Sequence, residues 1–545
     1  MIWLWASLWW SSACGQSFVA PPSERFTPNY WAQNVRYSCK YPFMRYDANR
    51  WEWKNDGAVA PFFEALLQSG SRKLRVVHIG DSHVQADAYT GYVRNRLQEL
   101  FGAGGRGMVF PYAAAKTHAA YDYQTFAAGA WDYARNVHAV HKFPVGVSGA
   151  TVRTYKSGSS VKIAFTGAYR DAGARRLGIL SSSGEKSFDF RILWPGGDSL
   201  ATPPPPATVL DLPLSPTTIE IYAKARKPEQ NHLDLYGIWL ETIEDSGILY
   251  HSVGINGAGL GHLLQSELLE AHLAVLKPDL VVIDLGANDY YSFGIKEDYE
   301  ANLRAVAQKV KRVAPSALIS CSQDIYRRYY ANVADCQKAA EIARSVAFET
   351  DCAFYDWYGV SGGGKSMLKW QAYGLAQNDR VHLTHKGYFY KGEVFVCGLL
   401  NSLWSYKTGT ALPEPRFEST APPVAVASVA PPPPGASVKY VIRPGDNLGA
   451  IAQKFGVSVA QIKQWNGLGS DFIRAGSTLV IHGQKPAPAA EPVPVPTGNA
   501  VHVVEAGESL WSIARKYATT VDKIARDNGV VNNKIHPGQK LNILR

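Results

Sequence analysis

The sequence contains little cysteine and no long run of basic residues. Only six of its 545 residues are cysteine, and none has the spacing of a zinc-binding motif. The formal net charge is +10, but lysine and arginine are spread along the chain, and no nucleic-acid-binding motif is present. These absences predict that the protein holds no metal ion or other cofactor and binds no nucleic acid. The spread positive charge favours attraction to anionic polymers or membrane surfaces.

The first residues form a short apolar segment rich in tryptophan, and small residues follow at positions 11–13. Such a run indicates an export signal, and it is too short to span a membrane stably, so we expect no transmembrane domain. We assign residues 1–20 to the signal and expect the protein in the periplasm or cell envelope. Cys14 leaves two alternatives open, which are simple cleavage of the signal and a lipid anchor at this cysteine. The five other cysteines allow disulfides, but their spacing does not fix a pairing.

Two segments rich in proline and alanine divide the chain, which is too long for a single core. They span residues 408–437 and 483–500, and such segments remain extended because they cannot bury apolar surface. They separate a large N-terminal unit from two small units at 438–482 and 501–545.

In the large unit, apolar runs alternate with helical patterns. Fully apolar strands predict a parallel sheet covered on both faces, so we expect a doubly wound α/β domain from residues 21–101 and 246–407. The expected strands are Leu74–Ile79, Ile248–Val253, Leu280–Leu285, Ala317–Cys321 and Ala353–Trp357. The expected helices are Ala88–Leu100, Leu260–Leu276, Tyr299–Val313 and Ala331–Thr350.

Residues 102–245 interrupt this pattern. They lack long helical periodicity and show strand-like alternation instead, as in Phe188, Phe190 and Ile192, with glycine and proline between the pieces. This indicates an all-β insertion with a sandwich or jelly-roll architecture.

Two short motifs of the large unit supply the residues of a nucleophilic site. Ser82 follows the first expected strand, and a serine hydroxyl becomes a good nucleophile when a base that a carboxylate orients removes its proton. Asp379 and His382 have the spacing for this pair. His385 is a second candidate base, but its sequence context predicts a surface position at the start of the last helix. Because Ser82 has polar neighbours at 81 and 83, we expect its turn to face water.

Two further motifs supply donors for an oxyanion. The backbone N–H groups of Ser82 and Gly257 can contribute, since glycine lets a carbonyl approach its amide closely. Asn288 follows the third expected strand and can offer its side-chain N–H. We expect Asp289 to stabilise the loop after this strand and not to take part in the reaction.

In this order, the four motifs resemble the SGNH hydrolase superfamily, also called GDSL esterases, over residues 73–405 without the insertion. The resemblance implies a flavodoxin-like three-layer fold and ester hydrolysis through an acyl-serine, with Ser82, Gly257, Asn288, Asp379 and His382 in the roles above. His83 stands where many members carry an aliphatic residue. Together with the insertion, this is similar to bacterial peptidoglycan O-acetylesterases that contain an inserted carbohydrate-binding-like module.

The two C-terminal units repeat one pattern at a constant offset of 62 residues. They resemble LysM domains, which implies a β-α-α-β fold and binding of glycans that contain N-acetylglucosamine, such as peptidoglycan. The resemblance places the binding grooves at Gly445, Asp446, Asn447, Leu448 and Ile473 in the first copy, and at Gly507, Glu508, Ser509, Leu510 and Ile535 in the second. An alternative is that Leu448 and Leu510 belong only to the core.

The combined expectation is an exported serine esterase that removes O-acetyl groups from peptidoglycan and is retained on the cell wall by LysM modules. Three alternatives stay open. The first is an O-acetyltransferase that uses the same acetyl-serine, and the second is an esterase for other substrates, such as lipids or chitin esters. The third is a wall-binding scaffold without activity.

Overall fold

The computed structural model describes residues 28–421 apart from 119, 167–172, 174, 205, 292–293, 328–330, 411 and 413. In the C-terminal part it describes 437–442, 476–482, 500–504 and 538–543, with single residues between them. The chain divides into a large unit, Met1–Val424, and a small unit, Ala425–Arg545. The expected export segment and Cys14 lie outside the described residues. Within the described part, no helix is long and apolar enough to cross a membrane.

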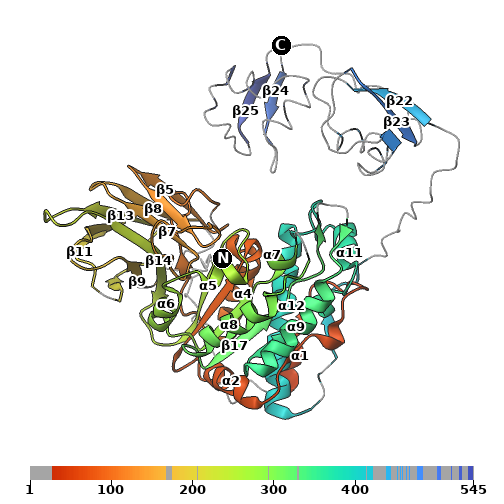
Figure 1. Cartoon of the computed structure of the whole chain (residues 1–545), viewed down its shortest axis with the longest axis horizontal. Coiled ribbons are helices and arrows are strands. Elements are labelled where there is room, and N and C mark those ends of the chain that lie inside the picture. Colours follow the sequence, from red (N-terminus) through yellow and green to blue (C-terminus); the bar gives the residue numbers. More distant parts are fainter. Residues whose placement is uncertain are drawn as a thin grey trace, which may run out of the picture. The chain divides into compact units, whose positions relative to one another are not determined.

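A six-stranded sheet forms the centre of the large unit (Figure 1). Its order is β15 (Gly247–Gly254), β3 (Lys73–Gly80), β16 (Leu280–Asp284), β17 (Ser316–Ser320), β20 (Ala353–Tyr355) and β2 (Trp51–Glu52). The first five strands pair in parallel and β2 is antiparallel. In chain order the parallel strands follow the flavodoxin-like sequence 2-1-3-4-5. The predicted α/β fold is confirmed, and all five expected strands are present.

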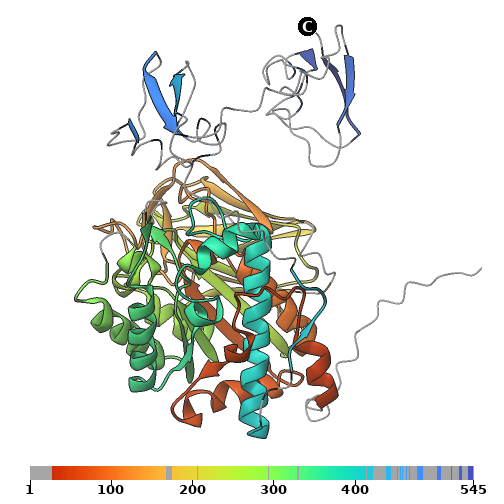
Figure 2. The ribbon, with the colours of Figure 1, turned by 90° about the vertical axis from the view of Figure 1, so that its right-hand side faces the viewer.

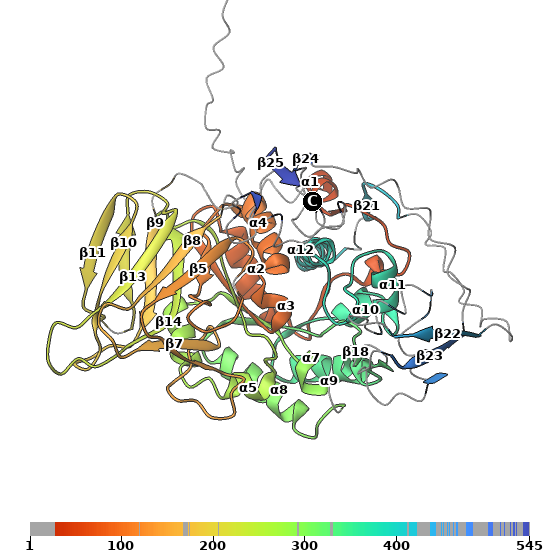
Figure 3. The same ribbon diagram turned by 90° about the horizontal axis from the view of Figure 1, so that it is seen from above.

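Helices cover both faces of this sheet, and this explains why its strands are apolar throughout. Seen from above, α4 (Ala88–Phe101) and α12 (His385–Thr408) lie on one face (Figure 3). On the other face lie α5 (Leu260–Leu264), α8 (Tyr299–Lys311) and α9 (Cys336–Glu349). Every residue of β16 and β17 is buried between these layers.

Two predicted helices differ from the structure. The expected helix Leu260–Leu276 is broken into α5 and α6 (Leu269–Leu276). At the break, the backbone N–H of Leu268 donates to the carbonyl of Val145, while Glu267 accepts from the N–H of Val145, so the turn binds the insertion. The helix expected from Ala331 begins only at Cys336, because Ala331–Asn332 (β19) pairs with Tyr326–Arg327 (β18).

The N-terminal segment packs along the outer side of the large unit. It forms α1 (Pro28–Asn34) and β1 (Arg36–Tyr37), and Figure 2 shows these in red beside the long teal helix α12. Strand β1 pairs with β21 (Arg416–Phe417), and a bridge joins Lys40 to Thr420. Residues 416–421, which the sequence predicts to belong to the first linker, therefore pack against the start of the described chain.

The insertion is a sandwich of two antiparallel sheets, as predicted. Its inner faces carry the alternating apolar residues, including Phe190, Ile192 and Ile221. One sheet has the order β11 (Gly197–Ala201), β10 (Asp189–Trp194), β13 (Thr218–Lys224), β8 (Ser160–Phe165) and β5 (Tyr123–Ala128). The other has β12 (Thr208–Leu212), β9 (Arg175–Ser181), β14 (Leu233–Thr242), β7 (Ala150–Thr154) and β6 (Asp132–Arg135), with β4 (Gly107–Val109) paired to β14.

A buried ionic cluster fastens the insertion to the α/β core. Arg106, just before β4, donates to both carboxylate oxygens of Asp122 at 2.7 Å and to Asp87 at 2.7 Å. Arg94 of α4 also pairs with Asp87 at 2.9 Å. All four side chains are at most 4% exposed. Burial opposes ionisation of Asp87, but the two guanidinium groups outweigh it and hold its pKa below the ordinary value.

Each C-terminal repeat is built on one antiparallel strand pair. In the first, β22 (Ser437–Val441) pairs with β23 (Thr478–His482), and in the second, β24 (Ala500–Val503) pairs with β25 (Lys540–Ile543). The side-chain amide of Asn466 bonds the backbone N–H and carbonyl of Val480, and Asn528 makes the same contacts with Asn542. Leu448 is buried in the first core. The other nine predicted groove residues lie outside the described residues.

Candidate active site

Four chain segments meet at the carboxyl edge of the central sheet. Ser82 follows β3, Gly257 follows β15, and Asn288 lies in α7 (Ala287–Tyr290), which follows β16. Asp379 and His382 come from the loop before α12. All five line one pocket of about 530 Å³. Strand β3 lies between β15 and β16, so this is the point where the strand order reverses, and open α/β sheets place their ligands there.

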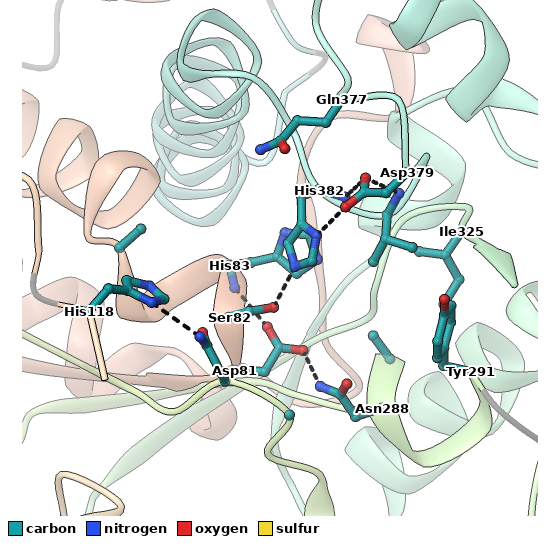
Figure 4. A pocket seen from close by; sticks show the side chains of 15 residues that line it. Asp81, Ser82, His83, His118, Asn288, Tyr291, Ile325, Gln377, Asp379 and His382 are labelled. Atoms are coloured by element: carbon teal, nitrogen blue, oxygen red, sulfur yellow. Dashed lines mark hydrogen bonds and ion pairs between the residues drawn. The ribbon is translucent and has the colours of Figure 1, made fainter. Parts of the chain in front are cut away.

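Ser82, His382 and Asp379 form a continuous hydrogen-bonded chain (Figure 4). Ser82 Oγ lies 3.0 Å from His382 Nε2, and His382 Nδ1 lies 2.7 Å from Asp379 Oδ2. The other carboxylate oxygen of Asp379 accepts from the backbone N–H groups of Val381 and His382, each at 3.0 Å. The spacing of three residues therefore lets one carboxylate hold both the ring and the backbone of the histidine.

Asp379 is arranged to remain ionised. Its partial burial disfavours the charged form, but hydrogen bonds from the His382 ring and from two backbone N–H groups outweigh this effect. The pKa of Asp379 is therefore lowered. An ionised carboxylate at this position keeps the proton of the imidazole on Nδ1 and leaves Nε2 free to accept one from Ser82.

Close packing fixes the turn that carries Ser82. Asp81 caps the short helix α3 (Ser82–Gln85) by accepting from the N–H of His83 at 2.9 Å. At Gly254 of β15, an added Cβ would lie 2.7 Å from the carbonyl oxygen of Asp81 and from the N–H nitrogen of Gln85. Only glycine allows this approach of β15 to the turn.

The residues flanking Ser82 do not face water, contrary to the prediction. Asp81 and His83 are 3% and 5% exposed. His83 Nδ1 lies 2.9 Å from the hydroxyl of Tyr388, and its ring lies 5.2 Å from the ring of His382. Burial, together with the nearby His382 and Lys391, holds the pKa of His83 well below its ordinary value. His83 therefore packs beside His382 as a neutral ring.

Two of the three expected oxyanion donors, Gly257 and Asn288, differ in their surroundings. Gly257 has a φ of +79°, which favours glycine, and the space where a Cβ would be is open. Asn288 lines the pocket, but its side-chain nitrogen donates to Asp81 Oδ2 at 3.0 Å and to the carbonyl of Ala258 at 2.9 Å. Burial raises the pKa of Asp81 to about 7. The role of Asn288 as an oxyanion donor stays a prediction, because these contacts use its amide hydrogens.

Asp289 and His385, which lie close in sequence to Asn288 and His382, do not take part in the hydrogen-bonded chain of Ser82. Both carboxylate oxygens of Asp289 accept from the N–H of Leu260 at the start of α5, so this side chain braces the loop. His385 is exposed at the first position of α12 and does not line the pocket.

Three further residues at or beside the pocket were not predicted from the sequence. His118 and Asn256 line the pocket, whereas Gln85, one turn after Ser82, is buried behind it and bonds to two separate loops. Asn256 stands beside Gly257 in its motif, but the contacts that bring these three residues together are distant in the sequence.

Metal ligands are not grouped in this site or elsewhere in the described part of the chain. The cysteines Cys39, Cys321, Cys336, Cys352 and Cys397 are all free thiols. The polar side chains that line the pocket carry an alcohol, a phenol, imidazoles, carboxylates and amides.

Two family models match the chain. The model described as "LysM domain" matches residues 440–482 and 502–544, and that described as "GDSL-like Lipase/Acylhydrolase family" matches 228–389. The second match contains Gly257, Asn288, Asp379 and His382, whereas Ser82 lies before the insertion and outside it. The chain therefore carries a GDSL-like lipase/acylhydrolase domain and two LysM domains, as predicted.

A solved structure described as "Peptidoglycan O-acetylesterase in action, 5 min" is similar to this chain. It has 23% sequence identity and a TM-score of 0.54, and the match covers 64% of this chain and 97% of the other. At this identity the likeness concerns the fold.

Curated relatives share a shorter segment. The chain is 35% identical over 109 residues to an autolysin of Enterococcus faecalis. It is 36% identical over 121 residues to the N-acetylmuramoyl-L-alanine amidase sle1 of Staphylococcus aureus. These matches cover 20% and 22% of this chain, and 15% and 36% of the two relatives.

Proposed function

We propose that this protein is an exported serine esterase that removes O-acetyl groups from peptidoglycan and is retained on the cell wall by its LysM modules. The observation that carries the proposal is the chain from Ser82 Oγ to His382 Nε2 at 3.0 Å and on to Asp379 at 2.7 Å. The fold likeness to a peptidoglycan O-acetylesterase and the two LysM domains support the choice of substrate.

In the first half of the reaction, Ser82 Oγ attacks the acetyl carbonyl while its proton passes to His382 Nε2. Asp379 stabilises the imidazolium that forms. The carbonyl oxygen becomes an oxyanion, which the backbone N–H groups of Ser82 and Gly257 stabilise; one donor of this kind typically contributes about 3 kcal/mol. The proton on His382 Nε2 then moves to the sugar oxygen as the C–O bond breaks, leaving acetyl-Ser82.

In the second half, water takes the place of the sugar. His382 Nε2 accepts a proton from the water as its oxygen attacks the acetyl carbon, and a second tetrahedral intermediate forms. The bond to Ser82 Oγ then breaks, His382 returns the proton to Oγ, and acetic acid leaves and ionises to acetate. Atoms and charges balance as ester plus water giving alcohol plus acetic acid.

The LysM modules supply retention in this proposal. Two linked weak sites raise apparent affinity, because binding of the first brings the second to a high effective concentration near the same polymer. The autolysin and amidase names of the curated relatives support a location at the cell wall. A catalytic unit held there meets its polymeric substrate repeatedly.

The direct test compares the wild type with Ser82→Ala on O-acetylated sacculi and on sacculi stripped of acetyl groups by base. We expect the wild type to release acetate only from the O-acetylated sacculi, and Ser82→Ala to be slower by about 10³-fold or more. Both proteins should bind the sacculi equally.

Other outcomes would contradict the proposal. Transfer of acetyl groups from an aryl acetate to glycan oligomers, without net acetate release, would identify a transferase. Faster cleavage of long-chain esters than of acetyl esters would identify a lipase. Failure of Ser82 to react with an organophosphonate probe would favour a scaffold.

A further inference from the structure

The β insertion contributes directly to the wall of the catalytic pocket. His118, from the segment between β4 and β5, lines the same pocket as Ser82. Gln85 holds this segment, because its side-chain nitrogen donates to Thr117 Oγ1 at 2.9 Å and to the carbonyl of His118 at 2.8 Å. Gln85 is only 2% exposed, so these contacts form inside the protein.

The same glutamine also holds the loop that carries Gly257. Its side-chain oxygen accepts from the backbone N–H of Asn256 at 2.7 Å. One buried side chain on the helix of Ser82 therefore fixes His118 from the insertion and Asn256 from the α/β core. Both residues have a set position relative to the nucleophile.

His118 and Asn256 interact with each other through their side chains. Asn256 Nδ2 lies 3.2 Å from His118 Nδ1 and donates to it, so the ring proton of a neutral His118 is on Nε2. Burial, together with the nearby His382, lowers the pKa of His118. At neutral pH, His118 is thus an uncharged donor.

With a volume of about 530 Å³, the pocket has room for more than the acetyl group. In Figure 4, Ser82 lies between His118 on one side and the pair of His382 and Asp379 on the other. His118 is exposed, although its segment is tied down by Gln85. Among the described residues that line the pocket there is no lysine or arginine. This lining suits an uncharged ligand part rich in oxygen acceptors, and not a carboxylate or a phosphate.

We propose that His118 and Asn256 form a carbohydrate subsite that holds the sugar ring bearing the ester while its acetyl group lies at Ser82. This inference rests on the proposed function and assigns recognition of the sugar to a residue of the insertion. His118 Nε2–H donates to a hydroxyl, ring or amide oxygen of the sugar, and Asn256 keeps the ring in the tautomer that can donate.

The test measures selectivity between two acetyl esters. An aryl acetate has no sugar, whereas an O-acetylated oligomer of N-acetylglucosamine presents one. For His118→Ala we expect the KM for the oligomer to rise about fivefold to tenfold, the effect of one lost uncharged hydrogen bond. The kcat/KM for the aryl acetate should fall much less. His118→Gln, which keeps a donor, should recover part of the loss.

The insertion offers a matched control in His138. This histidine is half-buried, contacts Arg135 and does not line the pocket. His138→Ala should leave the kinetics of both esters unchanged. Three results for His118→Ala would overturn the subsite. They are an equal loss of activity on both esters, no change on either ester, and a shifted pH profile for cleavage of the aryl acetate.

The same experiment separates this inference from the proposed function. If the wild type cleaves the acetylated oligomer but releases no acetate from sacculi, the assignment of peptidoglycan fails and the subsite stands. If the wild type releases acetate from sacculi while His118→Ala keeps its full preference for the oligomer, the subsite fails and the function stands.

Discussion

At the scale of single residues, the central requirement is that His382 presents the correct ring nitrogen to Ser82. Asp379 meets it by accepting from Nδ1 at 2.7 Å, while its other oxygen accepts from two backbone N–H groups. The carboxylate thereby fixes the tautomer and the orientation of the ring together.

Asp379→Asn tests this assignment. The amide keeps an oxygen for the backbone contacts but turns a donor toward Nδ1, which forces the ring proton onto Nε2, and His382 then cannot accept the proton of Ser82. We expect kcat for an aryl acetate to fall by about 10³- to 10⁴-fold with little change in fold. Steady-state kinetics and circular dichroism measure the two quantities.

Asp289→Asn is the matched control. Asp289 also follows a strand near the pocket, but it accepts from the start of α5 and has no contact with the imidazole. Its amide variant keeps an acceptor and should retain activity within about threefold. Comparable losses in both variants would refute a specific role of Asp379.

The sequence predicted residues whose chemistry is visible in short motifs. Ser82, Asp379 and His382 are recognisable because a nucleophile, a carboxylate and an imidazole occur in a characteristic order. The burial of His83 was not predictable, since its partner Tyr388 lies 305 residues away. Gln85, His118 and Asn256 escaped notice for the same reason, because tertiary contacts alone make them a group.

At the scale of elements, apolar runs sufficed to locate the five parallel strands of the central sheet, whereas the two-residue antiparallel edge strand β2 was not predicted. The helix break between α5 and α6 could not be predicted in this way. The segment 265–268 has helical periodicity, but its contacts with Val145 of the insertion override it. Hydrophobic periodicity predicts which face of an element is buried, but it does not predict hydrogen bonds between that element and a segment distant in the sequence.

The cluster of Arg94, Arg106, Asp87 and Asp122 predicts a stability that depends on pH. The pKa of Asp87 is lower in the folded protein than in the unfolded chain, where it is about 3.9. Its contribution to stability is therefore complete above the unfolded pKa and is lost as the pH falls through the folded pKa. Asp87→Asn should destabilise the protein by about 3–5 kcal/mol at pH 7, because buried guanidinium charge is left uncompensated.

Thermal unfolding of the wild type and the variant at several pH values measures this effect. The difference in Tm should be largest at neutral pH and should shrink in acid. Asp132→Asn is the control, because Asp132 pairs with the exposed Lys142 on the same insertion, and surface pairs contribute at most about 1 kcal/mol. An Asp87→Asn variant as stable as Asp132→Asn would contradict the anchoring role.

At the scale of the whole molecule, catalysis and retention are expected to be separable. The large unit contains every residue of the candidate active site, and the LysM matches begin at residue 440. Deletion of residues 438–545 should lower binding to sacculi about 10²-fold or more while kcat/KM for an aryl acetate stays within about twofold. Co-sedimentation and esterase assays measure the two properties.

A fall in aryl acetate turnover on deletion would show that the repeats support the catalytic unit. If the deletion left binding to sacculi unchanged, a surface outside residues 438–545 would be responsible for binding to the cell wall. Ser82→Ala provides the reciprocal control, because it should abolish turnover and keep binding.

The position of Gln85 has a consequence for how such proteins can recombine. Its side chain joins the helix of the nucleophile to Thr117 and His118 of the insertion and to the loop at Asn256. In a chimera that exchanges the β sandwich alone, the side-chain amide of Gln85 would face a different segment and could lose its hydrogen bonds to residues 117 and 118. We expect this loss to disturb the position of Ser82, which lies one turn away. If the proposed subsite is correct, a graft between homologues transfers substrate preference only when it includes the glutamine together with both loops that it bonds.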